Sequence, residues 1–130
     1  RVDRRQRQMC IRDSFKERWL RVLDDVFRQV DVVLTPTCPV TAPLRTDTAR
    51  MLETTRKISR FTYAWAMAGT PALSVPCGHA ANGLPVGIQL IAPRWHDARV
   101  LALGAHYQSA TAHHLSVPPM VRDAMARLCP

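Results

Sequence analysis

The sequence has no uninterrupted apolar run near the ~20 residues that a membrane-spanning helix requires. Its arginine-rich start is not followed by an apolar core, so the pattern of a secretory signal peptide is missing. Apolar residues make up 47% of the chain and charged residues 22%, a composition typical of globular proteins rather than disordered ones. With 130 residues the chain is long enough for one domain. We therefore expect a globular chain with no membrane partner.

Cysteine motifs that mark disulfide or metal sites are lacking. The four cysteines form no CxxC pair and no His–Cys cluster with the spacing of zinc ligands. This argues against a disulfide framework and against a structural metal site. We expect free thiols, no metal and a cytoplasmic location, because thiols stay reduced in that compartment. These cysteines are Cys10, Cys38, Cys77 and Cys129.

Glycine is also sparse, and the motifs that depend on it are missing. The five glycines form no GxGxxG, no Walker loop and no GxSxG elbow. Cys77 and His79 are too close on an extended chain to point at each other, so we interpret Cys77 as a buried structural thiol. Lys16 and Lys57, the only lysines, are assigned to solvated helix faces. Residue chemistry thus predicts no cofactor and no catalytic residue in this chain.

Acidic residues are too few to balance the basic ones, so the formal net charge is +8 and the isoelectric point lies near 10.4. Such a balance is typical of nucleic-acid-binding proteins. However, RRQRQMCIRDS (residues 4–14) can be back-translated, in one frame, into a widely used transposase-based sequencing adapter. We expect residues 1–14 to be a non-native, adapter-derived extension; a genuine basic arm is the alternative. Without residues 1–14 the net charge falls to +5.

Apolar residues recur at three- and four-residue steps in three parts of the chain, which predicts helices there. The second of these helices either continues or restarts partway along. The predicted helices run from Ser14 to Val30, from a cap at Asp47 or Thr48 to a glycine stop at Gly69, and from Asp97 to the pair His113-His114.

Three β-rich segments alternate with these helices. The apolar run at residues 32–34, ended by Pro36, is typical of a strand buried on both faces of a mostly parallel sheet. ALSVP (residues 72–76) and PVGIQLIA (residues 85–92) flank a loop that contains the turn pair Asn82-Gly83, which predicts an antiparallel or near-neighbour pairing. The alternation of helices and strands predicts the α/β class.

Two long motifs follow one another in the second half of the chain, FTYAWAMAGTPALSVPCG and, shortly after it, GLPVGIQLI. They resemble, in the same order, the C-terminal motifs of the amidase signature family, and the earlier DVVLTPTCP resembles a strand and loop of that family. The resemblance covers residues 15 to about 115. It implies an α/β fold with a mixed central sheet flanked by helices. Residues 15–130 would then be the C-terminal fragment of a single amidase domain.

The resemblance also implies a reaction, the cleavage of a carboxamide C–N bond. In the family a Ser attacks the carbonyl, a second Ser relays its proton, a Lys acts as base, and a Gly/Ser-rich loop stabilises the oxyanion. These groups lie upstream of the DVVLTP segment, so we assign none of Ser59, Ser74 and Lys57 to them. We expect a parent hydrolase with a small-molecule amide as substrate and no cofactor, and no activity from residues 1–130 alone.

One segment of the chain is expected to reach the substrate. In the family the residues before ALSVPCG run beside the substrate cavity, so the candidates here are Thr62, Tyr63, Trp65 and Met67. The match to the family is poorest here, since Ala64 replaces the usual Pro, Trp65 replaces Phe and Ala66 replaces Asn. Loss of an amide and gain of an indole suit a more apolar acyl or amine group. Core packing by Trp65 and Met67 is the alternative.

Two other functions stay open at this point. The A subunit of a tRNA-dependent Glu/Asp amidotransferase shares the same C-terminal motifs and would add tRNA and further subunits as partners. A non-catalytic module would use the basic surface and show salt-dependent binding of tRNA or DNA by residues 15–130. Apart from these alternatives, we expect no nucleic-acid partner.

Overall fold

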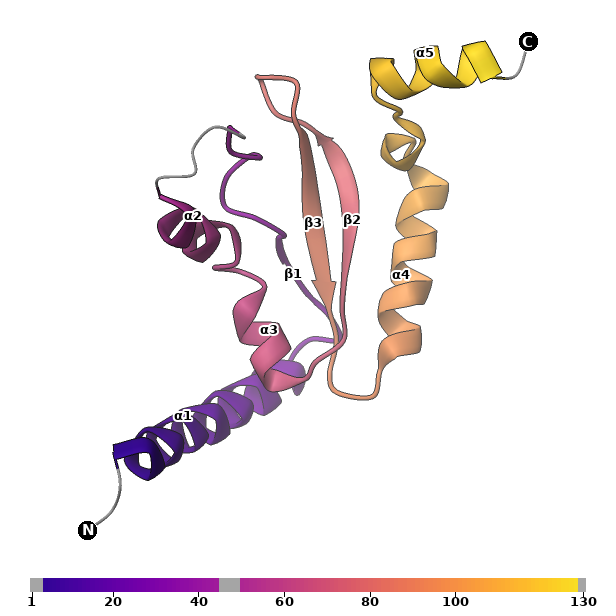
Figure 1. Ribbon diagram of the computed structural model, residues 1–130. Coiled ribbons are helices and arrows are strands. Elements are labelled where there is room, and N and C mark those ends of the chain that lie inside the picture. Colours follow the sequence, from indigo (N-terminus) through magenta and orange to yellow (C-terminus); the bar gives the residue numbers. More distant parts are fainter. Residues whose placement is uncertain (1–3, 45–49, 129–130) are drawn as a thin grey trace.

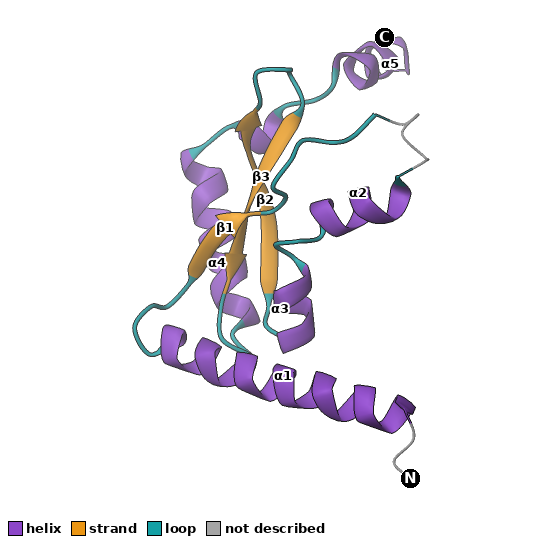
Figure 2. Ribbon diagram, turned by 90° about the vertical axis from the view of Figure 1, so that its left-hand side faces the viewer, coloured by secondary structure: helices purple, strands orange, loops and turns teal. Residues whose placement is uncertain are grey.

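A computed structural model describes residues 4–44 and 50–128 and consists of one small sheet with helices on both of its faces (Figures 1 and 2). The first helix crosses one end of the sheet, and the last helix lies near the opposite end (Figure 1). In chain order the elements are α1 (Arg4–Phe27), β1 (Val33–Pro36), α2 (Met51–Ile58), α3 (Tyr63–Ala68), β2 (Ala72–His79), β3 (Pro85–Ile91), α4 (Asp97–Ala110), the 3-10 turn η1 (His113–Leu115) and α5 (Pro119–Leu128).

The sheet has the strand order β1-β3-β2, and both pairings are antiparallel. The antiparallel pairing expected for the last two strands is therefore confirmed. In their connection Gly83 has a φ of 76°, a value that favours glycine. The Oδ1 atom of Asn82 accepts a hydrogen bond from the backbone N–H of Leu84 at 3.2 Å, which closes the turn.

Strand β1 differs from its prediction. It is an edge strand, and it pairs antiparallel with β3 instead of lying inside a mostly parallel sheet. The side chain of Leu34 is 61% exposed, so the strand is not buried on both faces. A continuous apolar run reports hydrophobicity but not the position of a strand within its sheet. The α/β class itself is confirmed.

The two faces of the sheet carry different helices (Figure 1). Helix α4 packs on the face formed by Leu73, Val75 and Leu90, where Val100 joins the buried core. Helices α1 and α3 pack at the other face around Ile91, which is fully buried. This second core contains Leu23, Trp65 and Ala68.

Helices form in all three parts of the chain where they were predicted, but their ends differ, and a further helix, α5, follows in the C-terminal tail. Helix α1 begins at Arg4, upstream of Ser14. The predicted caps Asp47 and Thr48 lie outside the described residues. The second helix restarts, giving α2 and α3, and Gly69 ends α3 in the left-handed conformation with a φ of 67°.

The prediction that His113-His114 ends the third helix is wrong. Helix α4 stops at Ala110, because Thr111 adopts an extended backbone with φ −137° and ψ 158°. The Thr111 hydroxyl donates a hydrogen bond to the carbonyl of Tyr107 at 2.9 Å, which satisfies one of the free carbonyls of the last turn. The two histidines belong to the separate turn η1, which packs against β2.

Across the described ranges, no helix combines the length and the apolar character that crossing a membrane would take.

Candidate functional site

A row of polar side chains crosses the sheet on the face that carries α3. Gln89 on β3 is the register partner of Thr35 on β1 and of Ser74 on β2. Because residues directly opposite each other on neighbouring strands share a face, these three side chains lie side by side. Thr37 extends the row, since its Oγ1 lies 2.7 Å from the Oγ of Ser74 in a hydrogen bond. We call these four residues the polar row.

Two atoms of the polar row are buried without a hydrogen bond. Among the residues that the structure describes, none hydrogen-bonds the Oε1 of Gln89 or the Oγ1 of Thr35, and both atoms are buried. Gln89 as a whole is only 5% exposed. An unsatisfied buried polar group costs about 1–3 kcal/mol, so nearly all such groups in proteins have a partner. The polar row is therefore the part of this sheet where a further hydrogen-bonding group is most needed.

A concavity of about 350 Å³ opens between the polar row and α3; we call it the α3 concavity. It combines hydroxyl groups, one amide and an apolar wall. Its lining residues are Thr37, Thr62, Trp65, Ala66, Thr70, Ala72, Ser74 and Gln89.

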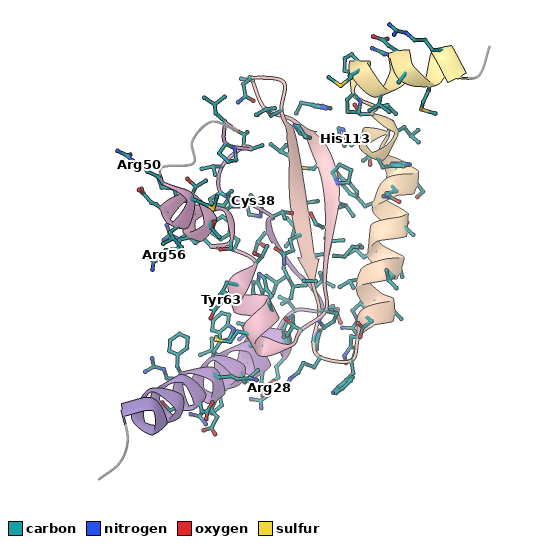
Figure 3. All side chains as sticks on the ribbon, in the orientation of Figure 1. Arg28, Cys38, Arg50, Arg56, Tyr63 and His113 are labelled. Carbon is teal, nitrogen blue, oxygen red and sulfur yellow. The ribbon has the colours of Figure 1, made fainter. Side chains whose placement is uncertain are left out.

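The four residues predicted to reach substrate do not all line this concavity. Thr62 and Trp65 belong to its lining, whereas Tyr63 and Met67 do not. Tyr63 is 67% exposed and points away from the sheet (Figure 3). Met67 is half-buried. Contact of any of these four side chains with a substrate stays a prediction.

Trp65 has two structural roles at once. It is 9% exposed and packs with Ala68 and Ile91 in the core under α3. Its ring centroid lies 5.9 Å from that of Trp19, and the Nε1 of Trp19 donates to the carbonyl of Ala64 at 3.1 Å. Core packing by Trp65 is thus confirmed, and Trp65 also belongs to the lining of the α3 concavity. The tryptophan pair holds the start of α3 on α1.

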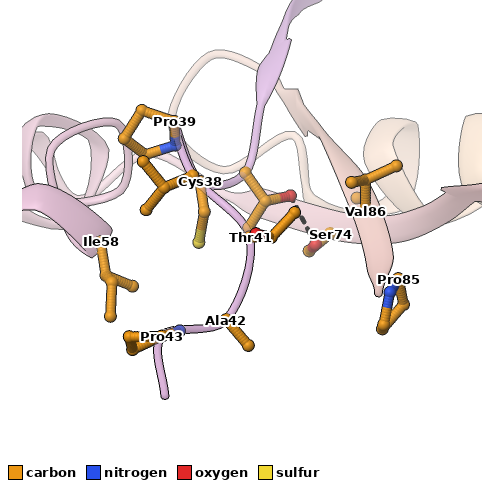
Figure 4. A pocket seen from close by; sticks show the side chains of 12 residues that line it. Cys38, Pro39, Thr41, Ala42, Pro43, Ile58, Ser74, Pro85 and Val86 are labelled. Carbon is orange, nitrogen blue, oxygen red and sulfur yellow. Dashed lines mark hydrogen bonds between the residues drawn. The ribbon is translucent and has the colours of Figure 1, made fainter. Parts of the chain in front are cut away.

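A second concavity of about 470 Å³ lies between the proline-rich loop after β1, the end of α2 and the β2–β3 hairpin (Figure 4). We call it the loop concavity. Its wall is mostly apolar and includes Pro39, Val40, Ile58 and Val86. Thr37 and Ser74 line both concavities, so their hydrogen bond forms the boundary between the two.

Gly87 makes this boundary possible. A Cβ atom at Gly87 would lie 3.1 Å from the Oγ1 of Thr37 and 3.2 Å from the Oγ of Ser74. Both distances are shorter than ordinary van der Waals contact, so any other residue would press on the hydroxyl pair. The close approach of the hydroxyl pair therefore explains why this position of the PVGIQLI segment is a glycine.

The two concavities contain few groups that could transfer a proton. Within the linings formed by described residues, the one titratable side chain is the thiol of Cys38. The described part of the chain also contains no group of three His, Cys, Asp or Glu side chains that could hold a metal. The arrangement can therefore bind a neutral polar group.

The predicted site residues did not include the other lining residues, which are Thr37, Ala66, Thr70, Ala72, Ser74 and Gln89. A signal for Gln89 was present, because it is the one polar residue in the strand PVGIQLI. Strand alternation places Gln89 on the same face as the buried Ile91, where a polar side chain is unexpected.

The family model described as Amidase matches residues 2–101 of the chain. This chain belongs to the amidase family. The match includes α3, all three strands and the start of α4, so the residues of both concavities lie within it.

Two curated relatives bear similar segments. The chain is 41% identical over 96 residues to the A subunit of a glutamyl-tRNA(Gln) amidotransferase of Synechococcus sp. (strain RCC307), a match that covers 67% of this chain and 18% of that protein. It is 37% identical over 101 residues to a fatty acid amide hydrolase of Arabidopsis thaliana, covering 74% of this chain and 16% of that protein.

A solved structure shares the fold. The crystal structure of the A subunit of the glutamyl-tRNA(Gln) amidotransferase from Thermotoga maritima superposes with a TM-score of 0.60 at 35% sequence identity. The superposition covers 75% of this chain and 20% of that chain. The expected architecture, a part of the amidase fold, is thereby confirmed. The chain spans about a fifth of the length of the relatives that it matches.

Proposed function

We propose that the whole protein to which this chain belongs hydrolyses carboxamide C–N bonds, and that this chain forms one wall of the substrate cavity. One observation carries the proposal. Thr62 and Trp65, taken from the family resemblance as neighbours of the substrate, line the α3 concavity together with three residues of the polar row, Thr37, Ser74 and Gln89. Membership of the amidase family supports the reaction type.

The reactive groups in this proposal come from outside residues 1–130. A Ser would attack the amide carbonyl, a second Ser would relay its proton and a Lys would act as base, with backbone N–H groups binding the oxyanion. The present chain contributes binding. The indole of Trp65 provides an apolar wall, and Ala66, which stands where the family usually has Asn, removes an amide from that wall. Both changes favour an apolar acyl or amine group.

The proposal is tested by comparing two proteins, the 130-residue chain and the longest protein encoded at the same chromosomal position. Release of ammonia or amine from a panel of amides is measured for both. We expect turnover from the longer protein and none from residues 1–130. In the longer protein, Trp65→Ala should raise KM most for amides with large apolar groups. Turnover by residues 1–130 that disappears with a serine of this chain would contradict the proposal, as would a longer protein without amidase activity.

A second candidate function is that of the A subunit of a tRNA-dependent amidotransferase. It is favoured by the names of the relatives from Synechococcus and Thermotoga maritima. This function adds tRNA and further subunits as partners to the same amide chemistry. Salt-dependent binding of tRNA by the longer protein, with co-purifying subunits, would support it. Amide turnover without either would favour the stand-alone hydrolase.

We also assign the protein to the cytoplasm. Cys38 and Cys77 are free thiols in the structure, as is common for proteins kept under reducing conditions.

A further inference from the structure

The polar row places a buried, unpartnered amide at the wall of a small concavity. Gln89 lines the α3 concavity, is 5% exposed, and its Oε1 lacks a hydrogen bond from any described residue. On the neighbouring strand, the Oγ1 of its register partner Thr35 is unpartnered as well. Two such atoms at adjacent positions cost stability in this chain. Of the two residues only Gln89 lines the α3 concavity, so a ligand that brings its own donor would remove the cost at the Oε1 of Gln89.

The chemistry of the lining restricts the ligand to a neutral group. Apart from Thr37, Ser74 and Gln89, the α3 concavity is lined by two threonines, Thr62 and Thr70, and by the apolar residues Trp65, Ala66 and Ala72. Thus no described lining residue is charged. A charged ligand would lose its hydration here without gaining an opposite charge, which is far more costly than burying a neutral group.

The unpaired Oε1 of Gln89 needs a donor. A carboxamide has two N–H donors and a carbonyl acceptor, which are the same groups as the side chain of Gln89 itself. The terminal torsion of a glutamine side chain is broad, so either end of the Gln89 amide can be turned toward the concavity. A carboxylate has no N–H and carries a charge, so it satisfies neither requirement.

We infer that Gln89 and the polar row distinguish an amide from the corresponding carboxylate, so that the α3 concavity binds neutral amides and rejects carboxylates. The inference rests on the proposed function, because it makes Gln89 a specificity residue for the amide over its hydrolysis product. The hydroxyl pair of Thr37 and Ser74, hydrogen-bonded at 2.7 Å, bounds the site on one side. Through this selection, the carboxylate formed by hydrolysis would leave the cavity readily.

The test is a binding measurement on the 130-residue chain and needs no turnover. The chain is labelled with ¹⁵N, and the side-chain NH₂ signals of Gln89 are followed by NMR during titration with benzamide and, separately, with benzoate. We expect the Gln89 signals to move with benzamide at an apparent Kd at least tenfold lower than with benzoate. Equal responses to the two probes, or no response to benzamide at Gln89, would overturn the inference.

Two variants separate recognition from folding. Gln89→Leu keeps the approximate size of the side chain and removes its amide, so benzamide affinity should fall at least tenfold. Gln29→Leu is the matched control; Gln29 is exposed on the helix-end turn, where its Nε2 donates to the carbonyl of Asp25, and this variant should bind benzamide normally. If Gln89→Leu does not fold, the comparison of benzamide with benzoate on the unaltered chain decides alone.

Other outcomes also have a definite meaning. If a blocked tripeptide moves the Gln89 signals and benzamide does not, the concavity binds a polypeptide segment and the inference is wrong. If benzamide binds at Gln89 while the longer protein hydrolyses no amide, the proposed function fails and the amide-binding site stands. If the longer protein hydrolyses amides while the Gln89 signals do not move with benzamide, the proposed function stands and the inference about Gln89 fails.

Discussion

The two faces of the three-stranded sheet differ in how completely their side chains are buried and hydrogen-bonded. On the α4 face the contacts are apolar, and Leu90, Val75 and Val100 are each at most 4% exposed. On the α3 face an apolar core around Ile91 gives way to the polar row and to two concavities. The α4 face is therefore a closed apolar core, whereas the α3 face combines an apolar core with polar groups beside two concavities.

Strand β3 contributes to both faces from neighbouring positions. Leu90 is 2% exposed in the closed core, and Gln89 is 5% exposed at the concavity. Because side chains alternate along a strand, two adjacent residues experience different environments. Leu90 and Gln89 are almost equally buried but need not contribute equally to the free energy of unfolding. Substitutions at these two positions of β3 can measure the difference.

The largest effect is expected for Leu90→Ala on the α4 face. Removing this side chain leaves a cavity in a closed core and should lower the free energy of unfolding by about 2–5 kcal/mol. Urea unfolding of the 130-residue chain, followed by circular dichroism, measures the change. Leu34→Ala is the control, since Leu34 is 61% exposed on the edge strand, and it should cost less than about 1 kcal/mol. Similar losses in both variants would mean that the α4 face is not a closed core.

Gly104→Ala tests how closely α4 approaches β2. A Cβ at Gly104 would collide with the side chain of Leu73, with Val75 the next neighbour. Alanine is a better helix former than glycine by about 1 kcal/mol, so the collision must exceed this gain to be seen. Since overpacking costs about 1–3 kcal/mol, we expect a net loss of about 1 kcal/mol. A stabilised variant, measured in the same way, would show that the two elements can separate without cost.

Gln89→Leu should have a small effect of the opposite sign. The leucine removes an unsatisfied buried amide and adds apolar contact, so the free energy of unfolding should stay unchanged or rise by up to about 1 kcal/mol. Its contrast with Leu90→Ala is the sharpest test of the difference between the two faces. A loss above about 1 kcal/mol in urea unfolding would mean that Gln89 has a partner in the folded chain.

The smallest effect is expected at the boundary between the concavities. Thr37→Val removes one partner of the 2.7 Å hydrogen bond to Ser74, and the coupling between the two residues should be about 0.5–1 kcal/mol, because the pair is near the surface. A double-mutant cycle with Ser74→Ala measures it. Additive single effects would mean that the hydroxyl pair does not hold the loop on the sheet.

Predictions from sequence succeeded where the cause is local. Gly69 ends α3 because the left-handed conformation is accessible to glycine at little cost, and residues 80–84 form a turn because Asn82 and Gly83 supply its hydrogen bond and its positive φ. They failed where the cause lies elsewhere in the chain. Neither the edge position of β1 nor the end of α4 at Ala110 follows from the periodicity of its own segment.

The candidate site shows the same division. The resemblance identified residues 62–67 as one wall, but which of their side chains face the sheet depends on how the Trp19–Trp65 contact seats α3 on α1. Gln89 and Ser74 are distant from that segment in the sequence, and strand register alone brings them beside it. The sequence marks Gln89 only as the one polar residue of an apolar strand, and its position beside residues 62–67 is decided by the fold.

By itself, the sequence determined the α/β class, the antiparallel hairpin, the glycine stop of α3 and the amidase family, because propensity, turn chemistry and motif order depend on residues close together in the chain. The tertiary structure alone decided which face of the sheet is closed, which candidate residues line a concavity, and that Gln89 is buried without a partner among the described residues. The physical reason is that burial and hydrogen-bond satisfaction depend on groups that folding brings together from distant positions.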